Sequence, residues 1–280
     1  DATRMRLRYH PFMIDLAGKP IAITGASSGI GRATAIACAK AGMPVAIAAR
    51  REDRLADLVK EITTAGGKAI AVRVDVARQA DCDELVARTI REFGSIYSIY
   101  ANAGIGHESK IAEMSDADMR SIFETNFFGT LNTIRPALPH LRKARAGHVL
   151  ICSSCLSKIG MPFHGAYTAT KASQEHIARA MRIELRDEGV HVSSIHPVGT
   201  STEFFEAKAA RTGTSVAMNS PPRWATQPPE RVASAIVKCL RHPRPEVWTT
   251  WFGRLVFAAA DISPRFTDWG LTRFKARHKH

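Results

Sequence analysis

The chain has 280 residues, 45% of them hydrophobic and 23% charged, a composition that fits a folded globular protein and excludes a disordered one. It contains no run of about 18 apolar residues, so we expect no membrane-spanning helix. The formal net charge of +13 would suit an anionic partner, but no basic block interleaved with aromatic residues and no known nucleic-acid motif occurs, which argues against binding of DNA or RNA.

Short apolar segments alternate with helical periodicity from residue 20 to residue 196, after a polar N-terminal extension over residues 1–15. The expected strands cover residues 20–24, 45–49, 69–74, 96–101, 148–153 and 190–196. The expected helices cover residues 30–41, 52–64, 81–93, 116–143 and 165–187. Pro136 and Pro139 should kink or end the fourth helix. This alternation predicts an α/β fold, a Rossmann-type, doubly wound parallel sheet with helices on both faces.

The regular alternation ends after the last expected strand, and we expect one domain over residues 16–247. Residues 199–229 are rich in proline and follow the carboxyl end of that strand, where α/β sheets bind ligands, so we predict a substrate lid or an irregular loop there. Residues 248–280 combine aromatic and basic side chains. This pattern fits either peripheral contact with a membrane or a segment that packs against the domain or a second subunit.

A glycine-rich turn, Thr24-Gly25-Ala26-Ser27-Ser28-Gly29-Ile30-Gly31, joins the first strand to the first helix. Glycine permits positive φ and a close approach of the backbone to a ligand, and the helix N-terminus offers free N–H groups to a pyrophosphate. Because the turn follows the first strand of a βαβ unit, it predicts a nucleotide-binding site.

The spacing TGxxxGxG resembles that of the short-chain dehydrogenase/reductase family, and later strand ends match the same family. Asp75 and Val76 follow the third strand, where the family contacts adenine. Asn102, Ala103 and Gly104 match the family's NAG element. The resemblance implies an oxidoreductase whose nicotinamide cofactor contacts the turn residues Gly25, Ser27, Ser28, Gly29, Ile30 and Gly31.

The end of the second strand, Ala48-Ala49-Arg50-Arg51, bears on the choice of cofactor. NAD enzymes of this fold usually place an acidic residue there, which accepts hydrogen bonds from the ribose 2′-hydroxyl. Ala49 stands at that position, and the guanidinium of Arg50 suits a 2′-phosphate. Arg51 either adds to this charge or begins the next helix. The sequence therefore predicts NADP(H).

Tyr167 and Lys171 lie four residues apart, on one face of a helix. A nearby ammonium stabilises phenolate and lowers its pKa toward the range useful for proton transfer. Ser154 precedes Tyr167 at the family's spacing, and its hydroxyl would hydrogen-bond the substrate oxygen, with Ser153 as the alternative. The resemblance also implies that Lys171 holds the nicotinamide ribose and that Asn126 holds a water linking Lys171 to solvent.

Two positions depart from the family pattern. Ser157 stands three residues after the proposed serine, where glycine is common, and Val198 separates Pro197 from Gly199. The residues still expected beside the carboxamide and phosphates are Pro197, Gly199, Thr200 and Thr202. Cys152 and Cys155 form a CxxC around the serines, but without a second CxxC or a spaced His pair we expect no metal site.

These features imply an NADPH-dependent oxidoreductase acting on a carbonyl or secondary alcohol. The implied catalytic residues are Asn126, Ser154, Tyr167 and Lys171. The alternative is a regulatory protein that binds NADP without turnover, which the complete set disfavours. Two alternatives remain for five large apolar residues, which either line a lipophilic pocket or pack in the core or the lid: Phe163, Phe204, Phe205, Met218 and Trp224. The odd number of scattered cysteines favours the cytoplasm, and the resemblance implies a homodimer or homotetramer formed through the helices at 116–143 and 165–187.

Overall fold

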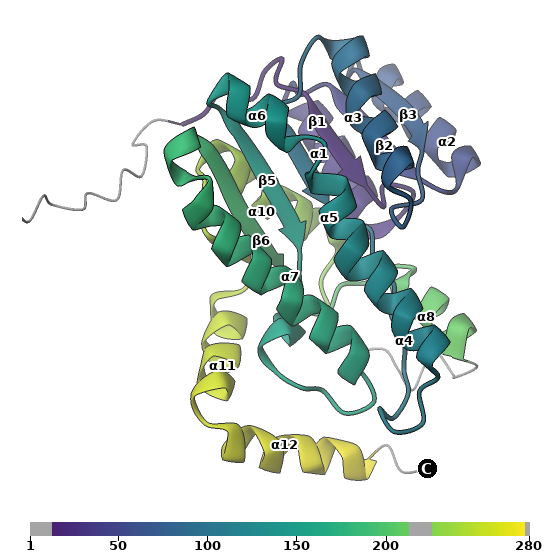
Figure 1. The fold of residues 1–280 in the computed structure, drawn as a ribbon, viewed down its shortest axis with the longest axis vertical. Coiled ribbons are helices and arrows are strands. Elements are labelled where there is room, and N and C mark those ends of the chain that lie inside the picture. Colours follow the sequence, from purple (N-terminus) through teal and green to yellow (C-terminus); the bar gives the residue numbers. More distant parts are fainter. Residues whose placement is uncertain (1–12, 213–225, 278–280) are drawn as a thin grey trace, which may run out of the picture.

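The structure, a computed structural model, describes residues 13–212 and 226–277. Seven parallel strands form one sheet in the order β3-β2-β1-β4-β5-β6-β7 (Figure 1). Their bounds are Ile21–Thr24 (β1), Val45–Ala49 (β2), Ala69–Arg73 (β3), Ser98–Ala101 (β4), Gly147–Cys152 (β5), Val190–His196 (β6) and Glu246–Trp248 (β7). The predicted α/β fold with a parallel sheet is confirmed. The edge strand β7 was not predicted, because three residues carry too little periodicity to indicate a strand.

Helices cover both faces of the sheet, as the apolar character of the strands requires. Every residue of β1, β2, β4 and β5 is buried. One face packs against α1 (Gly29–Lys40), α2 (Glu52–Thr64) and α10 (Pro229–Arg241). The other packs against α3 (Gln79–Phe93), α5 (Gly129–Ile134), α6 (Leu138–Ala144) and α7 (Gly165–Glu184). The strand order reverses between β1 and β4, the topological point at which sheets of this kind bind ligands beyond the carboxyl ends of their strands.

The expected helix over 116–143 is divided into several pieces. It begins as α4 (Asp116–Phe123), continues as one π-helical turn over Glu124–Phe128, and resumes as α5. Pro136 lies in the break before α6, and Pro139 occupies the first turn of α6, where a missing N–H is tolerated. The proline breaks were predicted. The π-helical turn was not, because one extra residue in a turn leaves no clear signature in hydrophobic spacing.

Beyond β6 the chain is more helical than expected. The predicted lid contains α8 (Phe204–Thr212), and two further helices, α11 (Trp251–Ile262) and α12 (Pro264–Arg277), follow β7. Figure 1 shows α11 and α12 extending away from the sheet as an L-shaped arm. Among the described residues, no helix is long and apolar enough to cross a membrane. The division into a domain over 16–247 and an extension over 248–280 stays a prediction.

Candidate active site

A cavity of about 840 Å³ lies at the carboxyl ends of the central strands. Of the predicted cofactor and catalytic residues, all line this cavity except Gly31 and Asn126. Gly31 packs directly behind the turn, where a Cβ would meet the carbonyl oxygen of Gly25. Asn126 is fully buried in the π-helical turn. Met218 and Trp224 lie outside the described residues. The structure thus gathers residues far apart in sequence around one elongated space.

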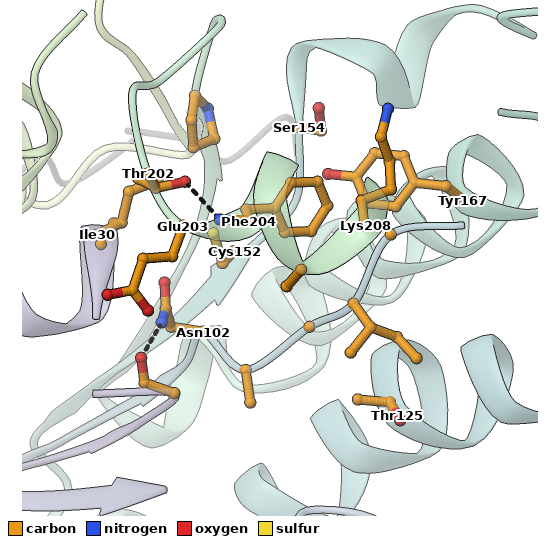
Figure 2. Close-up of a pocket in the computed structure, with 18 of the residues that line it drawn as sticks. Ile30, Asn102, Thr125, Cys152, Ser154, Tyr167, Thr202, Glu203, Phe204 and Lys208 are labelled. Carbon is orange, nitrogen blue, oxygen red and sulfur yellow. Dashed lines mark hydrogen bonds between the residues drawn. The ribbon is translucent and has the colours of Figure 1, made fainter. Parts of the chain in front are cut away.

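The glycine turn is held in shape by the end of β4. Gly25 has φ +66°, and a Cβ there would lie 2.8 Å from the Cα of Ala103, so only glycine fits without displacement of the backbone. The side-chain amide of Asn102 donates a 3.0 Å hydrogen bond to the carbonyl oxygen of Thr24. It donates another, of 3.3 Å, to the carbonyl oxygen of Gly25 (Figure 2). These contacts leave the N-terminus of α1 open toward the cavity, a geometry that suits a dinucleotide pyrophosphate.

The two arginines at the end of β2 have different surroundings. Arg51 donates to the hydroxyls of Ser27 and Ser28, each at 2.9 Å from Nη2, and forms a 2.9 Å ion pair with Glu203. Arg50 is exposed on the cavity rim, and no partner for its side chain is found in the described ranges 13–212 and 226–277. Arg51 therefore bridges the glycine turn to the segment before α8, whereas the guanidinium of Arg50 is available to a ligand.

Tyr167, Lys171 and Ser154 meet at the other end of the cavity. Figure 2 shows Ser154 and Tyr167 close to Phe204, whose ring centroid lies 5.6 Å from that of Tyr167. The hydroxyl of Ser154 also accepts a 3.1 Å hydrogen bond from the backbone N–H of Leu156. Lys171 lies with Nζ 5.5 Å from the Tyr167 ring centroid and donates a 2.7 Å hydrogen bond to the carbonyl oxygen of Cys152. The arrangement places a phenol, a hydroxyl and a buried amine around one point.

Burial dominates the electrostatics of this group. Desolvation raises the pKa of Tyr167 above its usual value, and a hydrogen bond to Ser154 only partly offsets this effect. Desolvation likewise lowers the pKa of Lys171. The shift of the Tyr167 pKa is opposite to the one expected from a nearby ammonium alone. Burial therefore decides the direction of the shift, and the Tyr167 hydroxyl keeps its proton at neutral pH.

Asn126 lies behind this group and not in the cavity. Its side chain bonds the backbone of Ile105, accepting from N–H at 2.8 Å and donating to the carbonyl at 3.0 Å. Its own carbonyl oxygen accepts from Gln174 and Thr130, each at 2.7 Å. In the structure Asn126 thus connects the segment after β4 to α7. The water that the family resemblance assigns to it stays a prediction.

The two adjacent serines have different contacts. Ser153 is buried, and its hydroxyl donates a 2.9 Å hydrogen bond to the carbonyl oxygen of Lys171, on the helix that carries Tyr167. Ser154 is the serine whose hydroxyl lies beside the tyrosine. The flanking Cys152 and Cys155 are both free thiols, and burial raises the pKa of Cys155 to about 12, which suppresses its thiolate.

The space beyond Tyr167 combines aromatic side chains with an ion pair whose lysine is buried. Phe163, Phe204 and Phe205 line it, as predicted from the sequence. Lys208 on α8 is 2% exposed and forms a 3.0 Å ion pair with Glu108. Sequence reasoning missed this pair, because its members are distant in the chain and match no motif.

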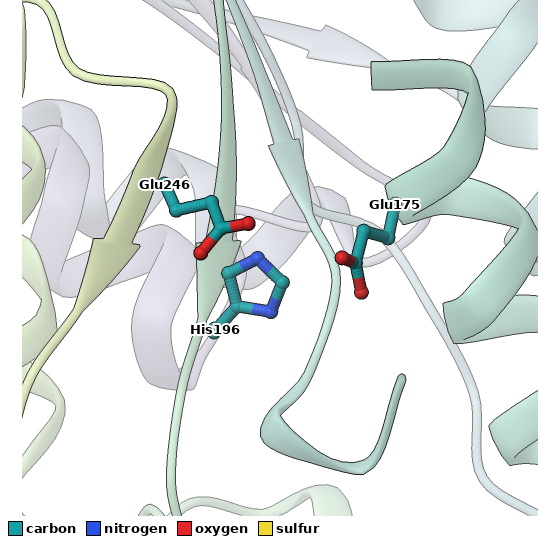
Figure 3. Close-up of side chains that lie close together, drawn as sticks. All are labelled: Glu175, His196 and Glu246. Carbon is teal, nitrogen blue, oxygen red and sulfur yellow. The ribbon is translucent and has the colours of Figure 1, made fainter. Parts of the chain in front are cut away.

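A cluster of titratable side chains lies behind the serine loop, formed by Glu175, His196 and Glu246 (Figure 3). Lys158 forms ion pairs with both carboxylates, so its ammonium already supplies the positive charge that a metal ion would bring to them. Burial opposes ionisation of Glu175, but hydrogen bonds from Lys158 and Ser157 hold its pKa below the usual value. Ser157, the departure from the family's glycine, is therefore part of this cluster and donates to Glu175 at 2.6 Å.

Comparison with known proteins agrees with this geometry. The family model described as short chain dehydrogenase matches residues 19–213. An uncharacterized oxidoreductase of Listeria innocua is 32% identical over 227 residues, which cover 80% of this chain and 91% of the relative. A short chain dehydrogenase/reductase from Burkholderia phymatum in complex with NAD has a TM-score of 0.79 at 25% identity, covering 88% of this chain and 94% of its own. An alcohol dehydrogenase from Thermococcus sibiricus complexed with 5-hydroxy-NADP has a TM-score of 0.73 at 27% identity, covering 82% and 94%.

Proposed function

Because the chain belongs to the short-chain dehydrogenase family of oxidoreductases, we propose that it transfers a hydride between NADP(H) and a carbonyl carbon or secondary alcohol. One observation carries this proposal: the same cavity has Ser154, Tyr167 and Lys171 at one end and the glycine turn with Arg50 at the other. When bound, the nicotinamide supplies or accepts the hydride. The chain's own residues orient the substrate oxygen and move its proton.

Tyr167 is the proposed proton donor in the direction of reduction. Its hydroxyl is protonated at neutral pH because burial raises its pKa, and it lies in hydrogen-bond contact with Ser154. Ser154 would hold the substrate oxygen as negative charge develops on it. Lys171 would hold the nicotinamide ribose and, when charged, would stabilise the phenolate that Tyr167 becomes after donation. In the direction of oxidation the same phenolate would take the proton back.

The choice of NADP over NAD is supported by Arg50 and Ala49. The solved relatives include one complexed with NAD and one with an NADP analogue, so family membership alone leaves both open. At the end of β2 this chain presents an apolar residue where a carboxylate would bind a ribose hydroxyl, followed by an exposed guanidinium on the cavity rim. A 2′-phosphate would gain a charge-assisted hydrogen bond there.

A lipophilic substrate is the second part of the proposal. Phe163, Phe204 and Phe205 present apolar surface to the space beside Tyr167. Lipophilic ketones and aldehydes, and long-chain or cyclic secondary alcohols, would each place an apolar group against this surface. The ion pair of Lys208 and Glu108 borders the same space and would accept one additional polar group on such a substrate.

The proposed reaction is tested by measuring oxidation of NADPH against a panel of carbonyl compounds, with NADH as the control cofactor. Tyr167→Phe should abolish turnover and leave NADPH binding nearly unchanged, whereas Tyr97→Phe, which does not line the cavity, should retain both. Turnover that survives in Tyr167→Phe refutes the assigned role. Binding of NADPH with no turnover of any carbonyl by the unmodified protein would favour the alternative, a regulatory protein that binds NADP.

Assembly and location are separate proposals. A homodimer or homotetramer would cover the exposed Phe128, in the π-helical turn, and Ile183, on α7. A cytoplasmic location is supported by the five cysteines, all of them buried free thiols. Contact of the C-terminal arm with a membrane is supported by the apolar side chains that α11 and α12 expose. Light scattering at several protein concentrations tests the assembly.

A further inference from the structure

The outer face of the C-terminal arm is unusually apolar for a surface in contact with water. Trp251, Phe252 and Ile262 are 75%, 65% and 84% exposed, and Phe266 and Trp269 on α12 are also exposed. The alternative that this segment packs its aromatic side chains on its own domain therefore does not hold for these residues. Contiguous exposed apolar surface of this kind marks a site of interaction.

The exposed side chains of α11 form one stripe. Trp251, Phe252, Leu255, Val256 and Ile262 are all exposed. At 100° per residue they fall within about 140° of the helix circumference, the width of an amphipathic face. The opposite side packs inward, where the ring of Phe257 lies 6.2 Å from that of Trp248. The helix thus has an inner face docked on the domain and an outer apolar face without a partner among the described residues.

A basic cavity of about 470 Å³ adjoins this stripe, between α7, β7 and α11. Its lining comprises four cationic side chains, one carboxylate and three apolar or aromatic residues: Lys158, Arg179, Arg182, Arg254, Glu246, Trp248, Ala258 and Ile262. Ile262 belongs to both the stripe and the cavity, so the two surfaces are continuous. Arg179 and Arg254 are exposed, and within the described ranges neither side chain has a hydrogen bond or ion pair.

We propose that the α11 stripe and the adjoining basic cavity bind the surface of a membrane that contains anionic phospholipid. The aromatic and aliphatic side chains of the stripe would enter the boundary between headgroups and acyl chains, where tryptophan is favoured. A lipid phosphate would sit among the cations of the cavity. In a phospholipid the charged headgroup adjoins the acyl chains, and in the protein the basic cavity adjoins the apolar stripe in the same way.

Charge distinguishes this occupant from a second copy of the chain. Residues 248–280 contain six Lys and Arg residues against two Asp residues, and the whole chain carries +13. A two-fold interface through α11 would bring the same cations of both copies together, and this repulsion would oppose association. An anionic membrane supplies the opposite charge, at about 1 kcal/mol for each basic residue near its surface.

Sedimentation with vesicles tests the proposal without using the reaction. The full chain should sediment with vesicles of phosphatidylcholine mixed with phosphatidylglycerol, bind vesicles of phosphatidylcholine alone much more weakly, and lose binding as salt screens the charges. The double variant Trp251→Ser, Phe252→Ser should bind at least about tenfold more weakly, because it removes two large apolar groups from the stripe. Arg179→Ser with Arg254→Ser should weaken binding only to the anionic vesicles.

Matched controls remove similar side chains from other exposed places: Met13→Ser for the stripe and Arg88→Ser for the cations. Both should bind like the unmodified chain, and circular dichroism verifies that each variant is folded. Equal binding to both vesicle types, or no difference between test and control variants, overturns the proposal. So does concentration-dependent self-association that the Trp251 and Phe252 substitutions abolish, or binding of inorganic phosphate at the cavity without any binding of vesicles.

Discussion

Removal of the Arg50 guanidinium should weaken NADPH binding and leave NADH binding unchanged. The two cofactors differ by the 2′-phosphate, and Arg50 follows Ala49 at the end of β2, on the cavity rim, with no partner for its side chain in the described part of the chain. A hydrogen bond to a charged group contributes about 1.5–3 kcal/mol. Because Arg50 is exposed and solvent screens its charge, we take the lower end, which corresponds to about a tenfold increase in the Kd of NADPH for Arg50→Ala.

The assay is a fluorescence titration of each variant with NADPH and with NADH, at low and at high salt. Arg88→Ala is the matched control, because it removes an exposed cation from α3 that does not line the cavity. It should change the Kd of NADPH little. High salt should narrow the difference between Arg50→Ala and the unmodified chain, since exposed charges are screened. An unchanged Kd of NADPH, or an equal loss for NADH, would refute the assignment of Arg50 to the 2′-phosphate.

Three further predictions concern residues whose surroundings the structure defines. Burial holds the pKa of His148 at about 3 instead of 6.5, so between these pH values the unfolded chain binds a proton that the folded chain does not. Thermal scans should therefore show the melting temperature falling as the pH drops from 6.5 toward 3, and the fall should be shallower in His148→Gln. Gly25→Ala should abolish NADPH binding in titrations, because the added Cβ would displace the turn. Gly18 has a similar φ, but a Cβ there would meet no other atom, so Gly18→Ala should only lower the melting temperature modestly. Ser153→Ala should lower the melting temperature with little loss of kcat, whereas Ser154→Ala, which also loses the bond from Leu156, should lower the melting temperature modestly but reduce kcat about 100-fold.

Features set by neighbours in sequence were predictable. The glycine turn is one continuous segment, and its form follows from the positions where the backbone needs glycine. Tyr167 and Lys171 share a helix face because the helix repeat places them there. Fully apolar strands indicated a sheet covered on both sides, and β2 and β6 have the predicted bounds.

Features that depend on distant parts of the chain were not predictable. Arg51 pairs with Glu203 across 152 residues, and the sequence gives no indication that the two would meet. The pKa of Tyr167 is another example. Periodicity shows that Lys171 is near, but how much water the folded chain excludes decides the direction of the shift, and that requires the packed structure.

The departure at Ser157 shows how a residue outside the family pattern can support the same site. Glycine at that position would offer backbone freedom, whereas Ser157 donates a hydrogen bond to Glu175, on the helix that carries Tyr167. From the same cluster, Nδ1 of His196 lies 3.1 Å from the carbonyl oxygen of Ser154 and donates to it in the matching tautomer. The loop that carries the serine is therefore fixed to the helix that carries the tyrosine through buried polar contacts. Since such contacts are stronger in a site of low dielectric constant, we expect them to keep the Ser154 and Tyr167 hydroxyls at a fixed spacing, which the proposed reaction requires.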